Sequence, residues 1–167
     1  MKTCHLSSIY QLTPHMLKIV DVDCLFLDID NTIRKYSETE PSKRTAELVK
    51  KLQNGGIKII LCSNNLKSRV KPFADKLACD FVAFSLKPSP LGMLRAWRKS
   101  GVSHKKIMVI GDQVFNDILA GKLIGLKTLL VLPIDSQNEP STVTARRIIF
   151  KPFENKIFKN RNPFLEG

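Results

Sequence analysis

The sequence has few cysteines, no long apolar run and a shortage of acidic residues. Its four cysteines in 167 residues are scattered, without a Cys-x-x-Cys spacing or a neighbouring histidine cluster. This argues against a zinc site, a redox motif or a disulfide framework, and favours reduced thiols. No segment approaches the roughly 20 apolar residues of a membrane-spanning helix, and the N-terminus lacks the apolar stretch of a signal peptide. We therefore expect a cytoplasmic protein.

Acidic residues are outnumbered, with 15 Asp and Glu against 27 Lys and Arg, so that the formal net charge is +12. A surface this basic attracts polyanions, which include nucleic acid, anionic lipid headgroups and phosphorylated substrates. Charge alone does not choose among these partners. The length and the 43% of hydrophobic residues are typical of one globular domain with its own core, spanning residues 1–167.

Apolar runs typical of buried strands alternate with amphipathic helical patterns along most of the chain. The expected strands are residues 24–29, 57–62, 81–84, 106–110 and 128–132. This alternation predicts an α/β fold, a Rossmann-like three-layer α/β/α sandwich around a mostly parallel sheet, with a core at about 22–133. Residues 1–20 are harder to interpret, although Thr13 and Pro14 are typical of the start of a short helix.

The C-terminal stretch, about 144–167, is a basic and aromatic extension of this core. Pro152 argues against one uninterrupted helix there. One interpretation is that its Ile and Phe side chains pack onto the domain. The other is an interfacial element whose apolar side chains enter a headgroup region while Lys and Arg meet anionic lipid. The second interpretation would place the protein peripherally at the inner face of a membrane.

Polar side chains stand just after four of the expected strands. They are Asp28 and Asp30, Ser63 and Asn64, Lys87, and Asp112 with Asp117. One such exit would be unremarkable, because Asp and Asn are common loop residues. Four together indicate a site, because ligands of open α/β sheets bind outside the carboxyl ends of the strands.

This set of side chains suits phosphoryl transfer. Aspartates supply the oxygen ligands that a magnesium ion prefers. A carboxylate beside that metal stays ionised and can attack phosphorus, which forms an aspartyl-phosphate. A second carboxyl two residues further on can act as general acid and then base. A hydroxyl and a lysine can hold the remaining phosphate oxygens.

In order and strand placement the motifs resemble the haloacid dehalogenase (HAD) superfamily of phosphatases. They are Asp28-Ile-Asp30-Asn-Thr32, Ser63-Asn64, Lys87-Pro88 and Gly111-Asp112-Gln-Val-Phe-Asn-Asp117, and the resemblance runs from about 24 to 132. Asn31 departs from the glycine that is commonest at its position in the superfamily.

The resemblance implies a role for each matched residue. Asp28 would be the nucleophile and Asp30 the acid/base. Mg²⁺ would be bound by the Asp28 carboxylate, the Asp30 backbone carbonyl and the Asp112 carboxylate, with Asp117 supporting the metal or Lys87 from behind. Lys87 would take part in catalysis and, together with Ser63, Asn64 and the adjacent backbone amide, would bind the substrate phosphate.

Four segments carry a narrower resemblance: Asp30-Asn-Thr, Ser63-Asn-Asn, Gly111-Asp-Gln with Asp117, and Gly125-Leu-Lys-Thr-Leu-Leu-Val. They resemble the YqeG-type subfamily, which is similar to phosphatidylglycerophosphate phosphatases. Segments 32–57 and 65–87, where many HAD enzymes insert a cap domain, hold little more than one helix each. We therefore expect the uncapped subclass III. An uncapped site is poorly closed to water by its own chain, so a large or surface-displayed substrate should shield it.

The leading hypothesis is a magnesium-dependent phosphatase for an anionic lipid, phosphatidylglycerophosphate first. A phosphatase for phosphoproteins or nucleic-acid ends would use the same site. A different class is a basic nucleic-acid-binding or ribosome-associated protein with a vestigial phosphatase site, which the charge permits. The sequence does not indicate the oligomeric state.

Overall fold

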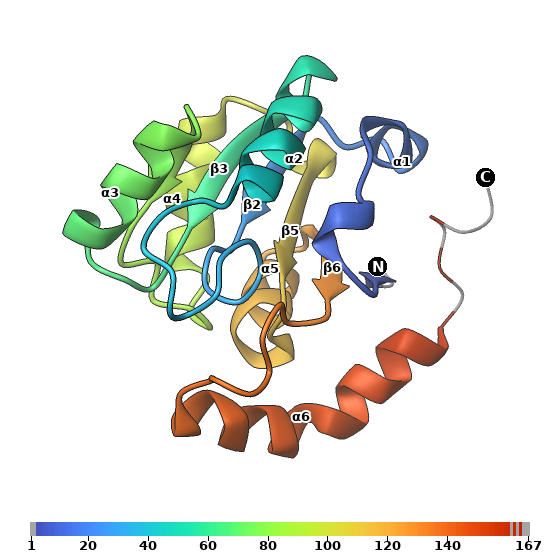
Figure 1. Ribbon diagram of the computed structural model, residues 1–167. Coiled ribbons are helices and arrows are strands. Elements are labelled where there is room, and N and C mark those ends of the chain that lie inside the picture. Colours follow the sequence, from blue (N-terminus) through green and yellow to red (C-terminus); the bar gives the residue numbers. More distant parts are fainter. Residues whose placement is uncertain (1–2, 161, 163, 165–167) are drawn as a thin grey trace.

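A six-stranded sheet forms the centre of the protein, whose computed structural model describes residues 3–160, 162 and 164 (Figure 1). The strands are β1 (Cys4–Leu6), β2 (Cys24–Leu27), β3 (Lys58–Cys62), β4 (Asp80–Val82), β5 (Ile107–Gly111) and β6 (Lys127–Val131). Every pairing is parallel, in the order β1-β6-β5-β2-β3-β4. Because β2 lies between β3 and β5, the residues that follow these three strands are neighbours at one edge of the sheet.

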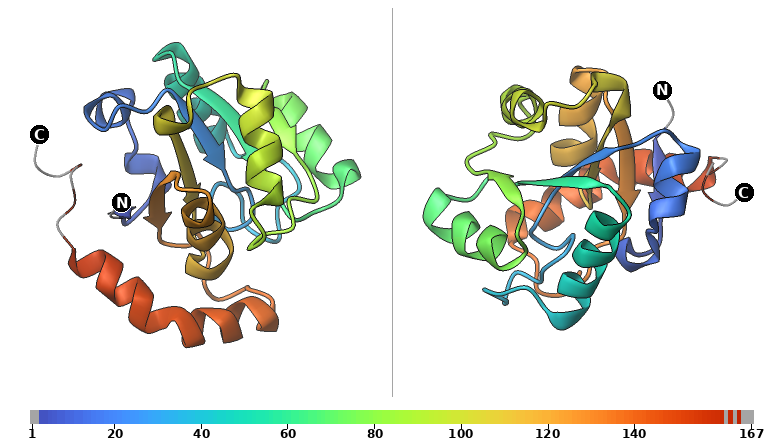
Figure 2. Two further views of the ribbon diagram at one scale, coloured as in Figure 1. Left: turned by 180° about the vertical axis from the view of Figure 1, so that it is seen from behind. Right: turned by 90° about the horizontal axis from the view of Figure 1, so that it is seen from above.

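Helices cover both faces of this sheet (Figure 2). They are α1 (Pro14–Ile19), α2 (Lys43–Asn54), α3 (Lys67–Lys76), α4 (Leu91–Ser100), α5 (Leu119–Leu123) and α6 (Ser141–Lys159), with short turns η1 (Ile9–Gln11), η2 (His104–Lys106) and η3 (Val114–Ile118). The first three helices share one core with the sheet, and α4 and α5 share the other. The predicted three-layer α/β/α architecture is confirmed.

The two cores follow from the alternation of side chains along each strand. In β2, Leu25 and Leu27 enter the first core while Cys24 and Phe26 enter the second, and all four are buried. A strand buried on both faces reads as a continuous apolar run, which is why the sequence located it.

The N-terminal segment contains a strand that the sequence pattern did not reveal. β1 has three residues and pairs with β6 at the edge of the sheet, and a run of this length shows no period. The short helix is where Thr13 and Pro14 indicated, because the Thr13 hydroxyl accepts a hydrogen bond from Met16 N at 3.2 Å.

The prediction that Pro152 interrupts the C-terminal helix was wrong. α6 runs through it as one helix of 19 residues and bends along its length (Figure 1). Proline removes one backbone donor and crowds the preceding turn, which kinks a helix more readily than it ends one on an exposed surface. Pro152 is exposed, and so is Ile148, whose carbonyl an N–H at position 152 would otherwise bond. The predicted C-terminal extension, about 144–167, includes residues 161, 163 and 165–167, which lie outside the described residues.

No inserted domain lies between residues 32 and 87, where the chain forms only α2, β3, α3 and β4 with their connections. The uncapped architecture expected from the segment lengths is therefore what the structure has. In the described parts of the chain, no helix combines the length and the apolar character needed to cross a bilayer.

Candidate active site

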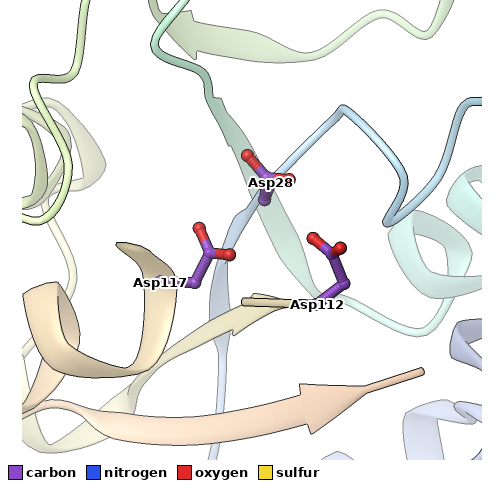
Figure 3. Close-up of side chains that lie close together, drawn as sticks. All are labelled: Asp28, Asp112 and Asp117. Carbon is purple, nitrogen blue, oxygen red and sulfur yellow. The ribbon is translucent and has the colours of Figure 1, made fainter. Parts of the chain in front are cut away.

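Three aspartates converge at the carboxyl ends of β2 and β5. The carboxylates of Asp28, Asp112 and Asp117 point into a shared space (Figure 3), and one oxygen from each lies within 4.8 Å of the others. All three side chains are buried. Asp28 is fixed at the strand exit by its backbone amide, which donates to Ile110 O at 2.9 Å.

The charges of these carboxylates are poorly balanced by the protein alone. Burial raises the pKa of Asp28 well above its usual range, and Asp117 and Asp112 add to the rise while Lys87 opposes it. Burial and Asp117 raise the pKa of Asp112 to about 7, although Arg147 opposes them. Three buried carboxylates this close favour a cation between them. A donor set made only of oxygens fits Mg²⁺.

Lys87 lies beneath the same cluster. Its ammonium group donates to an oxygen of Asp28, to Asp117 Oδ1 at 2.6 Å and to Cys62 O at 3.0 Å. Burial disfavours this charge, but Asp117 and Asp28 outweigh burial and raise the pKa of Lys87. The lysine therefore stays protonated and holds the Asp28 carboxylate in place.

Asn64 and Ser63 position the backbone around this lysine. Asn64 Oδ1 accepts from Lys87 N at 2.8 Å, and its Nδ2 donates to Lys87 O at 3.0 Å. The buried Ser63 hydroxyl accepts from Asn65 N at 3.1 Å and lies 3.5 Å from Asp30 Oδ2. The side chain of Asn64 is thus engaged by the protein, which leaves backbone groups of this loop as the more direct contacts for a phosphate.

Asp30 has a different environment from Asp28. It forms an ion pair with Arg34, and Asn65 Nδ2 donates to its Oδ2 at 2.6 Å. Both aspartates line one pocket. Asp30 belongs to that pocket but not to the cluster of three buried carboxylates.

A glycine makes room for Asp117. A Cβ atom on Gly111 would lie 2.2 Å from Asp117 Cγ, so any side chain at position 111 would displace that carboxylate. Asp117 stands on η3, a π-helical turn, and its Oδ2 accepts from Gln113 N at 3.2 Å. π-Helical turns are frequent at functional sites. The sequence pattern did not indicate either feature.

The C-terminal helix contributes a residue that sequence reasoning missed. Arg147 of α6 donates to Asp112 Oδ2 at 2.7 Å, to Asp112 O at 2.9 Å and, through Nε, to Glu139 Oε2 at 3.0 Å. In the sequence Arg147 is one basic residue among many, and nothing local distinguishes it. Its partner lies 35 positions away.

Asn31, the departure from the usual glycine, joins the same network. Its φ of 62° is in the left-handed region, which Asn tolerates better than most residues. Its Nδ2 donates to Asp135 O at 2.8 Å and to Glu139 Oε1 at 2.7 Å, and its Oδ1 accepts from Asp135 N at 2.8 Å. A glycine would make none of these side-chain bonds between the loop after β2 and the segment before α6.

These residues surround a pocket of about 310 Å³. It is lined by Asp28, Asp30, Tyr36, Asn64, Asn65, Arg69, Lys87, Gln113, Asn116, Asp117, Pro140, Val143 and Arg146. Asp112 lies behind it, in contact with Arg147. The sequence had singled out Asp28, Asp30, Asn64, Lys87 and Asp117, but not Tyr36 or the two arginines in the pocket wall.

Comparison with known proteins places this geometry in a family. Residues 5–125 match the family model described as haloacid dehalogenase-like hydrolase. A protein of Bacillus subtilis (strain 168), named "Probable phosphatase YqeG", is 33% identical over 131 residues, which are 78% of this chain and 76% of that protein. The chain belongs to the haloacid dehalogenase-like hydrolase family.

Solved structures share the HAD fold. The 3-deoxy-D-manno-octulosonate 8-phosphate phosphatase of Yersinia pestis aligns with a TM-score of 0.56 at 10% identity, over 87% of this chain and 89% of that one. The cobalt-bound deoxy-D-mannose-octulosonate 8-phosphate phosphatase of Haemophilus influenzae aligns with a TM-score of 0.52 at 12% identity, over 89% of this chain and 99% of that one. At these identities the likeness concerns the fold. α6 lies beyond the residues that the HAD family model matches, yet it contacts Asp112.

Proposed function

We propose that this HAD phosphatase is a magnesium-dependent enzyme that hydrolyses phosphomonoesters through an aspartyl-phosphate on Asp28. The convergence of three buried carboxylates and Lys87 in an open pocket carries the proposal. When bound, Mg²⁺ would supply positive charge for the phosphate oxygens, held by the carboxylates of Asp28 and Asp112 and the backbone carbonyl of Asp30, with Asp117 beside them.

The two aspartates of the first motif have separate roles in this mechanism. The Asp28 carboxylate attacks phosphorus and forms an O–P bond as the ester oxygen leaves, and Asp30 gives that oxygen a proton. Asp30 then takes a proton from the water that attacks the phosphoenzyme, which releases phosphate and restores Asp28. The positive charge of Lys87, whose protons bond Asp28, Asp117 and Cys62 O, attracts the phosphate during both steps, and Ser63 with the backbone amide beside it binds the phosphate oxygens.

The substrate that we propose is a lipid displayed on an anionic membrane, and phosphatidylglycerophosphate is the first candidate. Exposed apolar side chains near the pocket support this choice. Leu66, Phe84 and Leu86 are 62%, 54% and 43% exposed, and Phe84 N donates to the backbone of the pocket residue Asn65 at 2.9 Å. Large apolar side chains gathered at one edge are typical of an interaction surface.

α6 adds a second set of exposed apolar side chains. Ile148, Ile149 and Phe153 are 70%, 67% and 58% exposed, on a helix that also carries basic residues. Its buried side packs on η3 and β1, where Phe150 meets Phe115 at 5.0 Å between ring centroids. Both interpretations of the C-terminal stretch thus have support, because one side of α6 packs on the domain and the other side is free to enter a headgroup region. A peripheral location at the inner membrane face belongs to the same proposal.

The proposal is tested with vesicles of phosphatidylglycerol that contain phosphatidylglycerophosphate. With Mg²⁺ present we expect release of inorganic phosphate, reversible loss on chelation, and a loss of more than about 10³-fold in Asp28→Asn. A phosphopeptide and an oligonucleotide with a terminal phosphate are compared under the same conditions.

The comparison separates the alternatives. Faster hydrolysis of the phosphopeptide or the oligonucleotide than of the vesicle lipid would move the assignment to phosphoproteins or nucleic-acid ends. RNA binding that survives Asp28→Asn, with no ester hydrolysed by the wild type, would favour a basic binding protein with a vestigial site.

A further inference from the structure

Three basic side chains line the catalytic pocket, and they have different surroundings. Lys87 is buried and uses its ammonium protons on Asp28, Asp117 and Cys62 O. Arg69 of α3 is exposed, and Arg146 of α6 is half-buried. Neither guanidinium group forms an ion pair or a side-chain hydrogen bond within the described part of the chain. Two arginines in one pocket wall, both with their donors free, are available to a ligand.

The other charges in and around the pocket indicate what these arginines are for. Five carboxylates, of Asp28, Asp30, Asp112, Asp117 and Glu139, face the three cations Arg34, Lys87 and Arg147. With all of them ionised, one Mg²⁺ would balance the two remaining negative charges. The reacting phosphomonoester is then attracted by the metal and Lys87, and Arg69 and Arg146 remain as additional positive charge nearer to solvent.

The pocket also leaves a neutral polar atom without a partner. Asn116 lines it and is 7% exposed, and its Oδ1 accepts no hydrogen bond from the described residues. Its Nδ2 donates to Gln113 Oε1 at 2.8 Å. An unpaired buried amide oxygen is costly, so a donor on the ligand, such as a hydroxyl group, would stabilise the complex. The pocket thus offers contacts beyond those that one transferred phosphate would use.

We propose that Arg69 and Arg146 form a second anion site, which binds a phosphate that the substrate carries in addition to the one it loses. This inference rests on the proposed phosphatase function and narrows its substrate class. Guanidinium groups hold phosphate through paired hydrogen bonds. The two arginines come from helices far apart in the chain, α3 and α6, so a phosphate between them would be held from two sides. The second phosphate is a diester within a lipid headgroup or a free phosphate of a soluble compound, and the two share this chemistry.

The test compares one-phosphate and two-phosphate substrates in Arg69→Gln and Arg146→Gln. p-Nitrophenyl phosphate carries only the reacting group. Short-chain phosphatidylglycerophosphate below its micellar concentration carries the lipid headgroup without a bilayer, and fructose 1,6-bisphosphate carries two free phosphates. We expect each substitution to lower the ratio of kcat/KM for a two-phosphate substrate to that for p-nitrophenyl phosphate about tenfold, mainly through KM. The two-phosphate substrate whose kcat/KM ratio falls more identifies the source of the second phosphate.

Lys67→Gln is the matched control, because Lys67 is an exposed cation on the same turn of α3 and does not line the pocket. It should leave the ratio within twofold of the wild type. Equal losses on all three substrates would show that the arginines hold the reacting phosphate itself, and unchanged kcat/KM values on all three would show that they bind no phosphate. Either result overturns the inference.

A binding measurement keeps the test independent of turnover. In Asp28→Asn, calorimetric titration with glycerol 1,3-bisphosphate should give a dissociation constant that rises about tenfold when Arg69→Gln is added, while that for inorganic phosphate rises less. If the wild type hydrolyses no ester but this difference is found, the proposed function fails and the anion site stands. If turnover is found and the difference is not, the anion site fails alone.

Discussion

At the scale of single residues, the two aspartates of the first motif are distinguished by their partners. Asp28 is buried against Lys87, whereas Asp30 lies beside Arg34 and Asn65 in the pocket wall. Both follow β2, which ends at Leu27, and the turn after the strand, in which Asp30 pairs with Arg34, gives the two side chains different surroundings. In the proposed mechanism, the division between nucleophile and proton carrier would therefore follow from the local backbone.

We expect Asp30→Asn to depend on the leaving group. For an alkyl phosphate, kcat/KM should fall by about 10²- to 10⁴-fold, because the departing alkoxide needs a proton. For p-nitrophenyl phosphate the loss should stay below about tenfold, because that phenolate leaves unaided. The ratio kcat/KM is measured because it reports the first chemical step. Asp28→Asn is the control and should lose activity on both substrates. Equal losses of kcat/KM on the two substrates in Asp30→Asn would argue against Asp30 as the general acid.

The raised pKa of Asp112 predicts how stability depends on pH. A carboxyl with a pKa of about 7 when folded and 3.8 when unfolded binds more protons in the folded state between these values. Its contribution to stability is therefore present at low pH and is lost as pH rises toward 7 and above. Without metal, we expect the titration of Asp112 to lower the free energy of unfolding by about 2 kcal/mol as the pH rises from 5 to 7.5.

The measurement is urea denaturation in EDTA at both pH values. Asp112→Asn cannot titrate, so its stability should change less between them than that of the wild type. Added Mg²⁺ should restore part of the loss at pH 7.5 in the wild type, because binding to the folded state stabilises it. A wild type and a variant with the same pH dependence would contradict the assignment.

At the scale of elements, α6 belongs to the site although it lies outside the matched family region. Arg147 joins it to Asp112 and Glu139, and Asn31 joins Glu139 to the loop after β2. The side chain of Arg147 is 15% exposed, so these bonds are largely shielded from water. Removing one partner of such a network leaves the others as uncompensated charge.

We expect Arg147→Gln to lower the free energy of unfolding by about 2 to 4 kcal/mol in EDTA. The loss should be smaller in saturating Mg²⁺, since the ion supplies positive charge to Asp112. Arg146→Gln is the matched control, because Arg146 is the neighbour of Arg147 in the chain and has no such partners. It should change the free energy of unfolding by less than about 0.5 kcal/mol. Equal effects of the two substitutions in urea denaturation would show that Arg147 does not hold α6.

For the molecule as a whole, the net charge of +12 produces the interaction with the longest range. It favours approach to any anionic surface, while Leu66, Phe84 and the apolar side of α6 provide short-range contact at particular points. Attraction between a basic protein and an anionic leaflet decays over about 10 Å at 0.1 M salt. The proposed membrane contact therefore has a component that salt screens and one that it does not.

We expect association with phosphatidylglycerol vesicles to weaken at least about tenfold between 0.1 and 0.5 M NaCl, in a co-sedimentation assay. Ile149→Glu should weaken it further at both salt concentrations by removing apolar contact. Phosphatidylcholine vesicles are the control and should bind weakly throughout. Strong binding to them, insensitive to salt, would contradict an electrostatic contribution.

The alternation of strands and helices can be read from the amino-acid sequence alone, and so can the placement of Asp28, Asp30, Lys87 and Asp112 after strands. Both are local properties, because apolar runs and the polar residues that end them are neighbours in the chain. A parallel sheet brings such exits to one edge. The order of the motifs was therefore enough to expect one site.

Which side chains complete that site depends on the three-dimensional packing of the chain. Arg147 meets Asp112 across 35 positions, Asn31 meets Glu139 across 108, and Gly111 leaves the space that Asp117 fills. Pairs so distant leave no periodic signal, because each partner alone resembles an ordinary surface residue or turn residue. Which residues become partners depends on how α6 and η3 pack against the sheet, and this packing depends on the whole chain at once.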